Sequence, residues 1–186
     1  MKSEKEKMLS GELYNASDDE LSKERLKARL LIKELNDSRE DEESKRLGII
    51  KELIPTSGDN LWLEPPFYCD YGINMIIGDN VFFNFNCVVL DVAHVKIGDR
   101  TKMGPNVQIY TATHPMNYKE RASGLELGKA ITIGNDLWIG GAAIICPGVT
   151  IGDRTVIGSG SVVTKDIPSD VFAAGNPCKI IRELEQ

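Results

Sequence analysis

Residues 131–163, ITIGNDLWIGGAAIICPGVTIGDRTVIGSGSVV, place an apolar residue at every sixth position. The repeating positions are Ile133, Ile139, Ile145, Ile151, Ile157 and Val163. A period of six matches neither an α-helix nor one alternating strand, but it fits short strands joined by tight corners. Glycine, Asn and Asp between the apolar positions supply the positive φ that such corners need. The stretch therefore predicts a parallel β-helix, a solenoid in which three hexads make one triangular coil.

The same period continues toward the N-terminus in two earlier sets of apolar positions. These sets are Ile97, Met103 and Ile109, and before them Ile77, Phe83 and Val89. A small or branched residue recurs two positions ahead of the apolar one, at Val81, Thr101, Val107, Leu137, Ala143, Val149, Thr155 and Ser161. Both positions of a hexad face the interior of such a coil, so we expect both sets to be buried. The period does not set the handedness of the solenoid.

Two interruptions of the repeat are candidate binding surfaces. Val89 and Ile97 are eight positions apart instead of six, which predicts a bulge at residues 91–94. A longer insertion, charged and rich in glycine, predicts a protruding loop over residues 113–130. Insertions on one face of a solenoid commonly form its binding surface, and loops on rigid scaffolds commonly carry chemistry.

Residues 1–55 carry a different pattern and predict a helical segment ahead of a solenoid domain of residues 56–186. The sequence from Ser17 to Glu20 has the form of a capping box and predicts a helix start. Apolar residues then follow at roughly helical spacing, namely Leu21, Leu26, Ala28, Leu30, Leu31 and Leu35. A second helix is predicted from Glu40 to Leu53, with Leu47, Ile50 and Leu53 on one face. It should end near Ile54, because Pro55 disfavours helical geometry in the preceding residue.

Composition limits the class of protein. The 186 residues are 41% hydrophobic and 27% charged, as expected for one soluble domain with a modest extension. No apolar run is long enough to span a membrane, and the N-terminus lacks a secretory pattern, so we expect a cytoplasmic protein. The four cysteines lie far apart, which favours free thiols over a zinc site. A net charge of -6 argues against nucleic acid as the main partner.

Several motifs resemble those of the hexapeptide-repeat acyltransferases, most closely the maltose and galactoside O-acetyltransferases. They are TATHP (111–115), GNDLWIGG (134–141), VVTKDIP (162–168) and AAGNPCKIIRE (173–183). Residues 11–36 are similar to the helical N-terminal segment of the maltose enzymes, so the resemblance covers nearly the whole chain. It implies a left-handed β-helix, a homotrimer with active sites between neighbouring subunits, acetyl-CoA as co-substrate, no metal, and a sugar such as maltose or glucose as acceptor.

The resemblance also implies roles for particular residues. His114 would be the general base, since an imidazole can take a proton from a hydroxyl near neutral pH. A general base needs a partner that orients it, and Glu126, later in the same loop, is the carboxylate best placed for this; the alternative is an exposed loop charge. Asn84 would lie near the acceptor hydroxyl and the acetyl group, and Asp70 would bind the acceptor. Asp91, in the bulge, is a further candidate for acceptor binding.

A third group of residues would bind coenzyme A. The backbone amide of Gly141 would hold the developing oxyanion, since glycine lets a ligand approach the main chain closely. Basic residues near the C-terminus would contact phosphate. The candidate set is Asn84, Trp138, Gly141, Ser159, Thr164, Lys165, Lys179 and Arg182. For Trp138 the alternative is that it only covers the edge of the coil, and for Gly141 that it only turns a corner.

The acceptor is less well defined than the reaction. Ala16 and Val92 stand where the galactoside enzyme has acidic residues, which favours a maltose or glucose acceptor. Three alternatives remain: acetyl transfer to a non-carbohydrate hydroxyl such as that of an antibiotic, a non-catalytic trimeric scaffold, and a zinc carbonic anhydrase of the same fold. The last class uses three histidine ligands, whereas this chain has two histidines.

Overall fold

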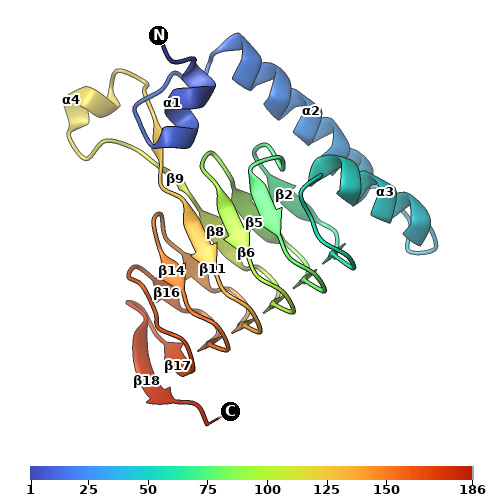
Figure 1. The fold of residues 1–186 in the computed structure, drawn as a ribbon. Helices are drawn as coiled ribbons and strands as arrows, with labels where there is room; N and C mark the ends of the chain where they lie inside the picture. The colour runs from blue at the N-terminus through green and yellow to red at the C-terminus, as the bar shows by residue number, and fades with distance from the viewer. Residues whose placement is uncertain (186) are drawn as a thin grey trace.

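The computed structural model describes residues 1–185 and shows a three-sided parallel β-solenoid with helices packed at one end (Figure 1). Successive coils add short strands to three sheets, in which the strands of neighbouring coils pair in parallel. Ile133 pairs with Ile151, which lies 18 residues further along the chain. The parallel β-helix predicted from the six-residue period is therefore confirmed.

The three walls are formed by strands of two to five residues. The first sheet stacks β1 (Trp62–Leu63), β4 (Phe82–Phe83), β7 (Lys102–Met103), β12 (Trp138–Ile139), β15 (Val156–Ile157), β17 (Val171–Ala174) and β18 (Lys179–Glu183). The second stacks β2 (Phe67–Cys69), β5 (Cys87–Leu90), β8 (Gln108–Tyr110), β13 (Ile144–Ile145) and β16 (Val162–Val163). The third stacks β3 (Met75–Ile77), β6 (Val95–Ile97), β11 (Ile131–Ile133) and β14 (Thr150–Ile151). In these three sheets only β18 runs antiparallel, and it closes the C-terminal end.

The interior contains the two positions that the repeat predicted. Every apolar hexad position, from Ile77 to Val163, is at most 3% exposed, and every position two residues ahead of it is at most 2% exposed. Three of these inner residues carry hydroxyls. Thr101 and Thr155 donate hydrogen bonds to backbone carbonyls at 3.0 and 2.7 Å, and Ser161 donates to the carbonyl of Gly158. Their burial is therefore compatible with a stable core.

The corners have left-handed backbone conformations, as predicted, at residues such as Asn80, Asn106 and Asp136. Two corners carry an arginine instead, with φ of 55° at both Arg100 and Arg154. Arg100 makes a bidentate ion pair with Asp136 of the next coil, with nitrogen–oxygen distances of 2.6 and 2.9 Å, and Arg154 pairs with Asp170 in the same way. These pairs fix the two side chains across neighbouring coils.

Three helices precede the solenoid, whereas the sequence predicted two. They are α1 (Glu4–Ser10), α2 (Asp19–Asn36) and α3 (Glu43–Leu53). The missed helix α1 starts with a complete capping box of Ser3 and Glu6. The predicted capping box at Ser17 is wrong, because the carboxylate of Asp18 caps α2. The predicted end of α3, just before Ile54 and Pro55, is confirmed.

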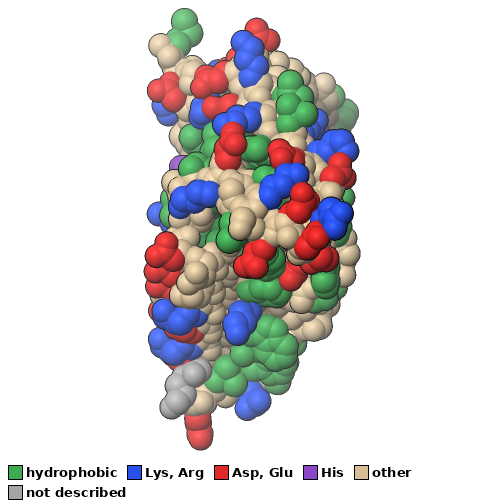
Figure 2. All heavy atoms as spheres, turned by 90° about the vertical axis from the view of Figure 1, so that its right-hand side faces the viewer, with side chains coloured by type: hydrophobic (Ala, Val, Ile, Leu, Met, Phe, Trp, Pro, Cys, Tyr) green, Lys and Arg blue, Asp and Glu red, His purple; other side chains and the backbone are tan. Residues whose placement is uncertain are grey.

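The buried faces of α2 and α3 match the predicted ones in part: Ala28, Leu35, Ile50 and Leu53 are buried as predicted. Leu26, Leu30 and Leu47 are 58%, 61% and 42% exposed. In the stripe that packs on the solenoid, the predicted residues are joined by Ile32 of α2 and Ile49 of α3, which were not predicted. Figure 2 shows acidic and basic side chains interspersed over the face that carries these helices. Within residues 1–185 no helix combines the length and the apolar character needed to cross a bilayer.

The protruding loop is anchored by pairing at its base. β9 (Ala112–Thr113) runs antiparallel to β10 (Leu127–Gly128), and the short helix α4 (Tyr118–Arg121) lies between them. A second apolar cluster, separate from the main core, contains Met8, Tyr14, Leu21, Tyr71 and Val92. It joins the N-terminal segment to the first coil and the bulge. The helical segment thus lies directly against the two interruptions of the repeat.

Candidate active site

A cavity of about 340 Å³ lies where the N-terminal segment, the bulge and the loop meet. It contains three residues that the sequence singled out, His114, Glu126 and Asp70. Ala16 and Val92, the two positions that lack an acidic residue, also line it. Its other lining residues were not predicted: Tyr14, Arg25, Arg29, Tyr71, Leu90 and Ala112. The structure therefore brings residues far apart in the sequence into one site.

His114 follows β9, and its side chain is exposed at the cavity, next to the buried Pro115. Glu126 enters from the other side of the loop. Its carboxylate accepts a hydrogen bond from the hydroxyl of Tyr14 at 3.1 Å, and the backbones of Tyr14 and Glu126 exchange two further hydrogen bonds of 3.0 and 3.1 Å. Burial, together with this carboxylate, raises the pKa of Tyr14. Within residues 1–185 no hydrogen bond joins Glu126 to His114, so the orienting role of Glu126 stays a prediction.

Arg25 organises the wall of the cavity formed by α2. Its guanidinium donates hydrogen bonds to the hydroxyl of Tyr71 at 2.7 Å and to the carbonyl of Ala16 at 2.6 Å. Burial raises the pKa of Tyr71, and the hydrogen bond from Arg25 opposes this effect. Arg25 thus connects the helical segment to the first coil, and it holds a positive charge beside the cavity.

Asp70 lies half-buried beside this charge. Burial raises the pKa of its carboxyl, while the positive charges of Arg25 and Arg29 act in the opposite direction. The carboxylate has no hydrogen-bond partner in the part of the chain that the structure describes. A partly buried carboxylate with free acceptor positions is suited to bind the hydroxyl of a ligand.

Asp91 does not line the cavity, and its position does not fit the predicted contact with an acceptor. Its side chain is fully buried, and its Oδ1 accepts hydrogen bonds from the backbone amides of Asp70 and Tyr71 at 3.0 and 2.9 Å. Its Oδ2 has no partner among the described residues. Asp91 therefore fixes the backbone that carries two cavity residues.

Burial raises the pKa of Asp91 to about 6. The carboxyl of an aspartate in an unfolded chain has a pKa of about 3.9, so the folded protein binds the proton of Asp91 more tightly than the unfolded chain does. The free energy of unfolding should therefore fall as the pH rises from about 4 to about 6. We compare the free energies of unfolding of Asp91→Asn and of the wild type. The variant's value minus the wild-type value should be about 2 to 3 kcal/mol larger at pH 7 than at pH 4, because asparagine does not ionise. Urea unfolding at both pH values measures this; an equal difference at both would contradict it.

Three of the predicted coenzyme A residues lie along one edge of the solenoid, between the first and second sheets. Asn84, Gly141 and Ser159 occupy three of four stacked corners, and the corner at Pro105 lies between those of Asn84 and Gly141. Backbone hydrogen bonds of 2.8 to 2.9 Å join each corner to the next. The side chain of Asn84 accepts a hydrogen bond from the amide of Phe85 at 2.8 Å. A Cβ at Gly141 would lie 3.1 Å from the carbonyl oxygen of Pro105, so the corner is tightly packed on that side.

The remaining predicted residues lie in two places. Trp138 and Arg182 line a hollow of about 250 Å³ on the first sheet, where the guanidinium of Arg182 lies 5.9 Å from the ring centroid of Phe172. Lys179 is exposed on β18 nearby. Thr164 and Lys165 are exposed at the other edge, where the second sheet ends. That edge is also the one from which the His114 loop departs.

The structure does not bring Asn84 and His114 together within one chain. Asn84 lies at the corner before β5, whereas Leu90, the last residue of that four-residue strand, lines the cavity of His114. At about 3.3 Å per residue, the length of β5, about 13 Å, lies between the two places. The edge of Asn84 and the cavity of His114 are therefore different places on the same chain.

Comparisons with known proteins agree with this architecture. Residues 7–58 match the maltose acetyltransferase hexapeptide capping motif, and residues 130–165 match the bacterial transferase hexapeptide of six repeats. The galactoside O-acetyltransferase of Escherichia coli K12 is 45% identical over 96% of this chain and 88% of its own length.

Two solved structures are similar over the full chain. A maltose O-acetyltransferase from Clostridium difficile 630 has a TM-score of 0.98 and 49% identity, covering 100% of this chain and 99% of that one. A galactoside acetyltransferase in complex with coenzyme A has a TM-score of 0.96 and 44% identity, covering 100% and 92%. The chain belongs to the hexapeptide-repeat acetyltransferases, in the group that includes the galactoside and maltose O-acetyltransferases.

Proposed function

We propose that the protein is an acetyl-CoA-dependent O-acetyltransferase that acetylates a hydroxyl of a sugar such as maltose or glucose. The observation that carries this proposal is the cavity in which an exposed histidine, His114, lies beside two carboxylates and two arginines. The relatives support it, because their names describe O-acetyltransferases of maltose and galactosides, and one of them was solved with coenzyme A.

His114 acts as general base in this proposal. Its imidazole takes the proton from the attacking hydroxyl while the new carbon–oxygen bond forms, and returns it to the sulfur as the carbon–sulfur bond breaks. Glu126, held by Tyr14, lies on the same cavity and would fix the orientation of the imidazole. The backbone amide of Gly141 would stabilise the negative charge that develops on the carbonyl oxygen.

The acceptor side of the cavity matches a neutral polyol. The carboxylate of Asp70 can accept hydrogen bonds from hydroxyls, and the guanidinium of Arg29 can donate them. Ala16 and Val92 make two positions of the wall apolar. These positions support an acceptor of the maltose or glucose type over a galactoside.

The residues proposed for coenzyme A match its chemistry. The lysine and arginine of β18, Lys179 and Arg182, can contact phosphates through charge-assisted hydrogen bonds. The exposed ring of Trp138 and the corner at Ser159 can line the pantetheine arm, with Thr164 and Lys165 at the neighbouring edge. When bound, acetyl-CoA supplies an activated acyl group, so the reaction needs no metal. In residues 1–185 no three His, Cys, Asp or Glu side chains cluster as metal ligands.

We further propose a homotrimer of left-handed β-helices, each a helical segment 1–55 followed by a solenoid 56–186. The separation of Asn84 from the cavity of His114 supports this, because a rotational assembly can place the Asn84 edge of one copy against the His114 loop of the next. The four free cysteines support a location in the cytoplasm, where thiols stay reduced.

Thiol release from acetyl-CoA tests the reaction. Glucose, maltose, a thiogalactoside and an antibiotic acceptor would be compared in parallel with the purified protein. We expect kcat/KM to be highest with maltose or glucose. If only the antibiotic is acetylated, the acceptor is a non-carbohydrate hydroxyl and not a sugar. If no acceptor leads to thiol release, the result favours a non-catalytic scaffold.

A further inference from the structure

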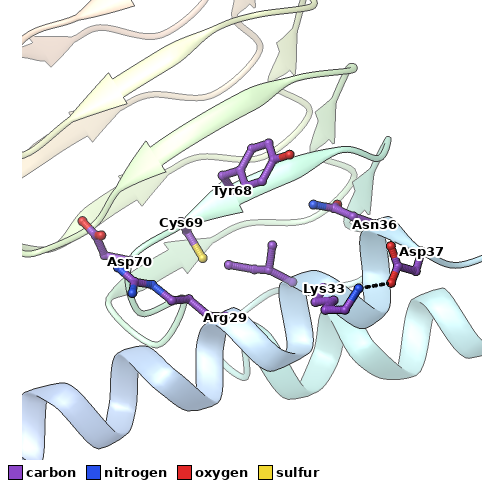
Figure 3. Close-up of a pocket in the computed structure, with 8 residues that line it drawn as sticks. Arg29, Lys33, Asn36, Asp37, Tyr68, Cys69 and Asp70 are labelled. Atoms are coloured by element: carbon purple, nitrogen blue, oxygen red, sulfur yellow. Dashed lines mark hydrogen bonds and ion pairs between the residues drawn. The ribbon is translucent and has the colours of Figure 1, made fainter.

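A second groove adjoins the cavity of His114. It has a volume of about 470 Å³ and lies between α2 and β2 (Figure 3). Arg29 and Asp70 line both spaces. Figure 3 shows Arg29 of α2 and Asp70 close together at one end, Tyr68 on the wall formed by β2, and the ion pair of Lys33 with Asp37 at the other end. The two spaces therefore share the boundary formed by Arg29 and Asp70.

Free polar groups are concentrated at this junction. Neither the guanidinium of Arg29 nor the carboxylate of Asp70 has a hydrogen-bond partner among residues 1–185. The polar groups at the far end are already engaged: Lys33 pairs with Asp37 at 2.6 Å, and the amide of Asn36 exchanges hydrogen bonds of 3.0 and 2.9 Å with the backbone of Phe67. A polar ligand is thus recognised mainly where the two spaces meet.

The body of the groove is apolar and aromatic. Tyr68 is 49% exposed, although it projects from a strand that packs beside α2. Ile32 and Cys69, which are only 5% and 7% exposed, form part of the lining. Groups of this kind pack against the apolar face of a pyranose ring, whose hydroxyls lie around its edge.

We infer that this groove binds the second ring of a di- or oligosaccharide acceptor, whose first ring occupies the cavity of His114. The inference rests on the proposed function and defines its substrate class further. A purely apolar group would leave Arg29 and Asp70 without partners, at a cost in affinity. A polyanion would meet the carboxylate of Asp70 at the entrance. The hydroxyls of a neutral sugar can accept a hydrogen bond from Arg29 and donate one to Asp70, while its ring packs on Tyr68.

Tyr68→Ala tests the inference, because Tyr68 lines the groove and does not line the cavity of His114. We expect kcat/KM for maltose to fall about tenfold, and kcat/KM for glucose to stay within about twofold of the wild type. Tyr68→Phe should keep most of the preference for maltose, because the ring remains. Ile76→Ala is the matched control, since Ile76 is 42% exposed on an outward strand position of the third sheet.

The outcomes separate this inference from the proposed function. If glucose and maltose are both acetylated but Tyr68→Ala leaves their kcat/KM ratio unchanged, the groove does not bind a second ring. An equal loss with both sugars would likewise overturn the inference, since it would indicate a role for Tyr68 in stability or assembly. If neither sugar releases thiol with the wild type, the proposed function itself fails.

Discussion

Replacing His114 with alanine is expected to lower kcat with maltose or glucose by about 10²-fold or more. Without the imidazole, the acceptor hydroxyl must lose its proton to water while it attacks the thioester. The affinity for coenzyme A should stay close to that of the wild type, because none of the residues proposed to bind it lines the cavity of His114. Steady-state thiol release gives kcat, and calorimetric titration with coenzyme A gives the affinity.

The other histidine of the chain provides the control. His94 lies in the bulge and does not line the cavity, so His94→Gln should leave kcat within about twofold of the wild type. Thermal unfolding of both variants shows whether the fold is retained. A kcat nearly unchanged in His114→Ala would remove His114 from the reaction and would leave the cavity as a binding site only.

The solenoid could be predicted because its pattern is local. Each hexad contributes an apolar residue and a small residue to the interior, so six residues are enough to show which side chains are buried. The helical segment lacks this property. Its leucines occur on more than one face of α2, and only packing against β2 selects Ile32 and Leu35 over Leu26 and Leu30.

The site could be predicted only in part. His114 and Glu126 stand out because they lie in the insertion that interrupts the repeat. Tyr14 and Arg25 do not stand out, because they lie in an amphipathic segment rich in charged residues, and only the fold brings them to Glu126 and Tyr71. Asp91 was singled out for its place in the bulge. Only the fold shows that its carboxylate is buried beneath Asp70 and accepts hydrogen bonds from two backbone amides of the preceding coil.

Two inactive variants are expected to restore each other's activity when they assemble together. His114→Ala and Asn84→Ala should each lose about 10²-fold in kcat, the second because a hydrogen-bonding group near the reacting atoms is removed. If each site takes His114 from one copy and Asn84 from the next, a mixed trimer always contains one site with both residues intact. Random assembly of equal amounts should then recover about a quarter of the wild-type activity, and the mixed trimers alone should have about a third.

Co-expression of the two variants with different affinity tags, followed by purification on both tags, isolates the mixed assemblies. The matched control is the same procedure with two differently tagged copies of His114→Ala, which should remain inactive. Mixed trimers that stay as inactive as the single variants would show that His114 and Asn84 do not share a site across subunits. A stable monomer with full activity would contradict the arrangement more directly, because the length of β5, about 13 Å, separates Asn84 from the cavity of His114 within one chain.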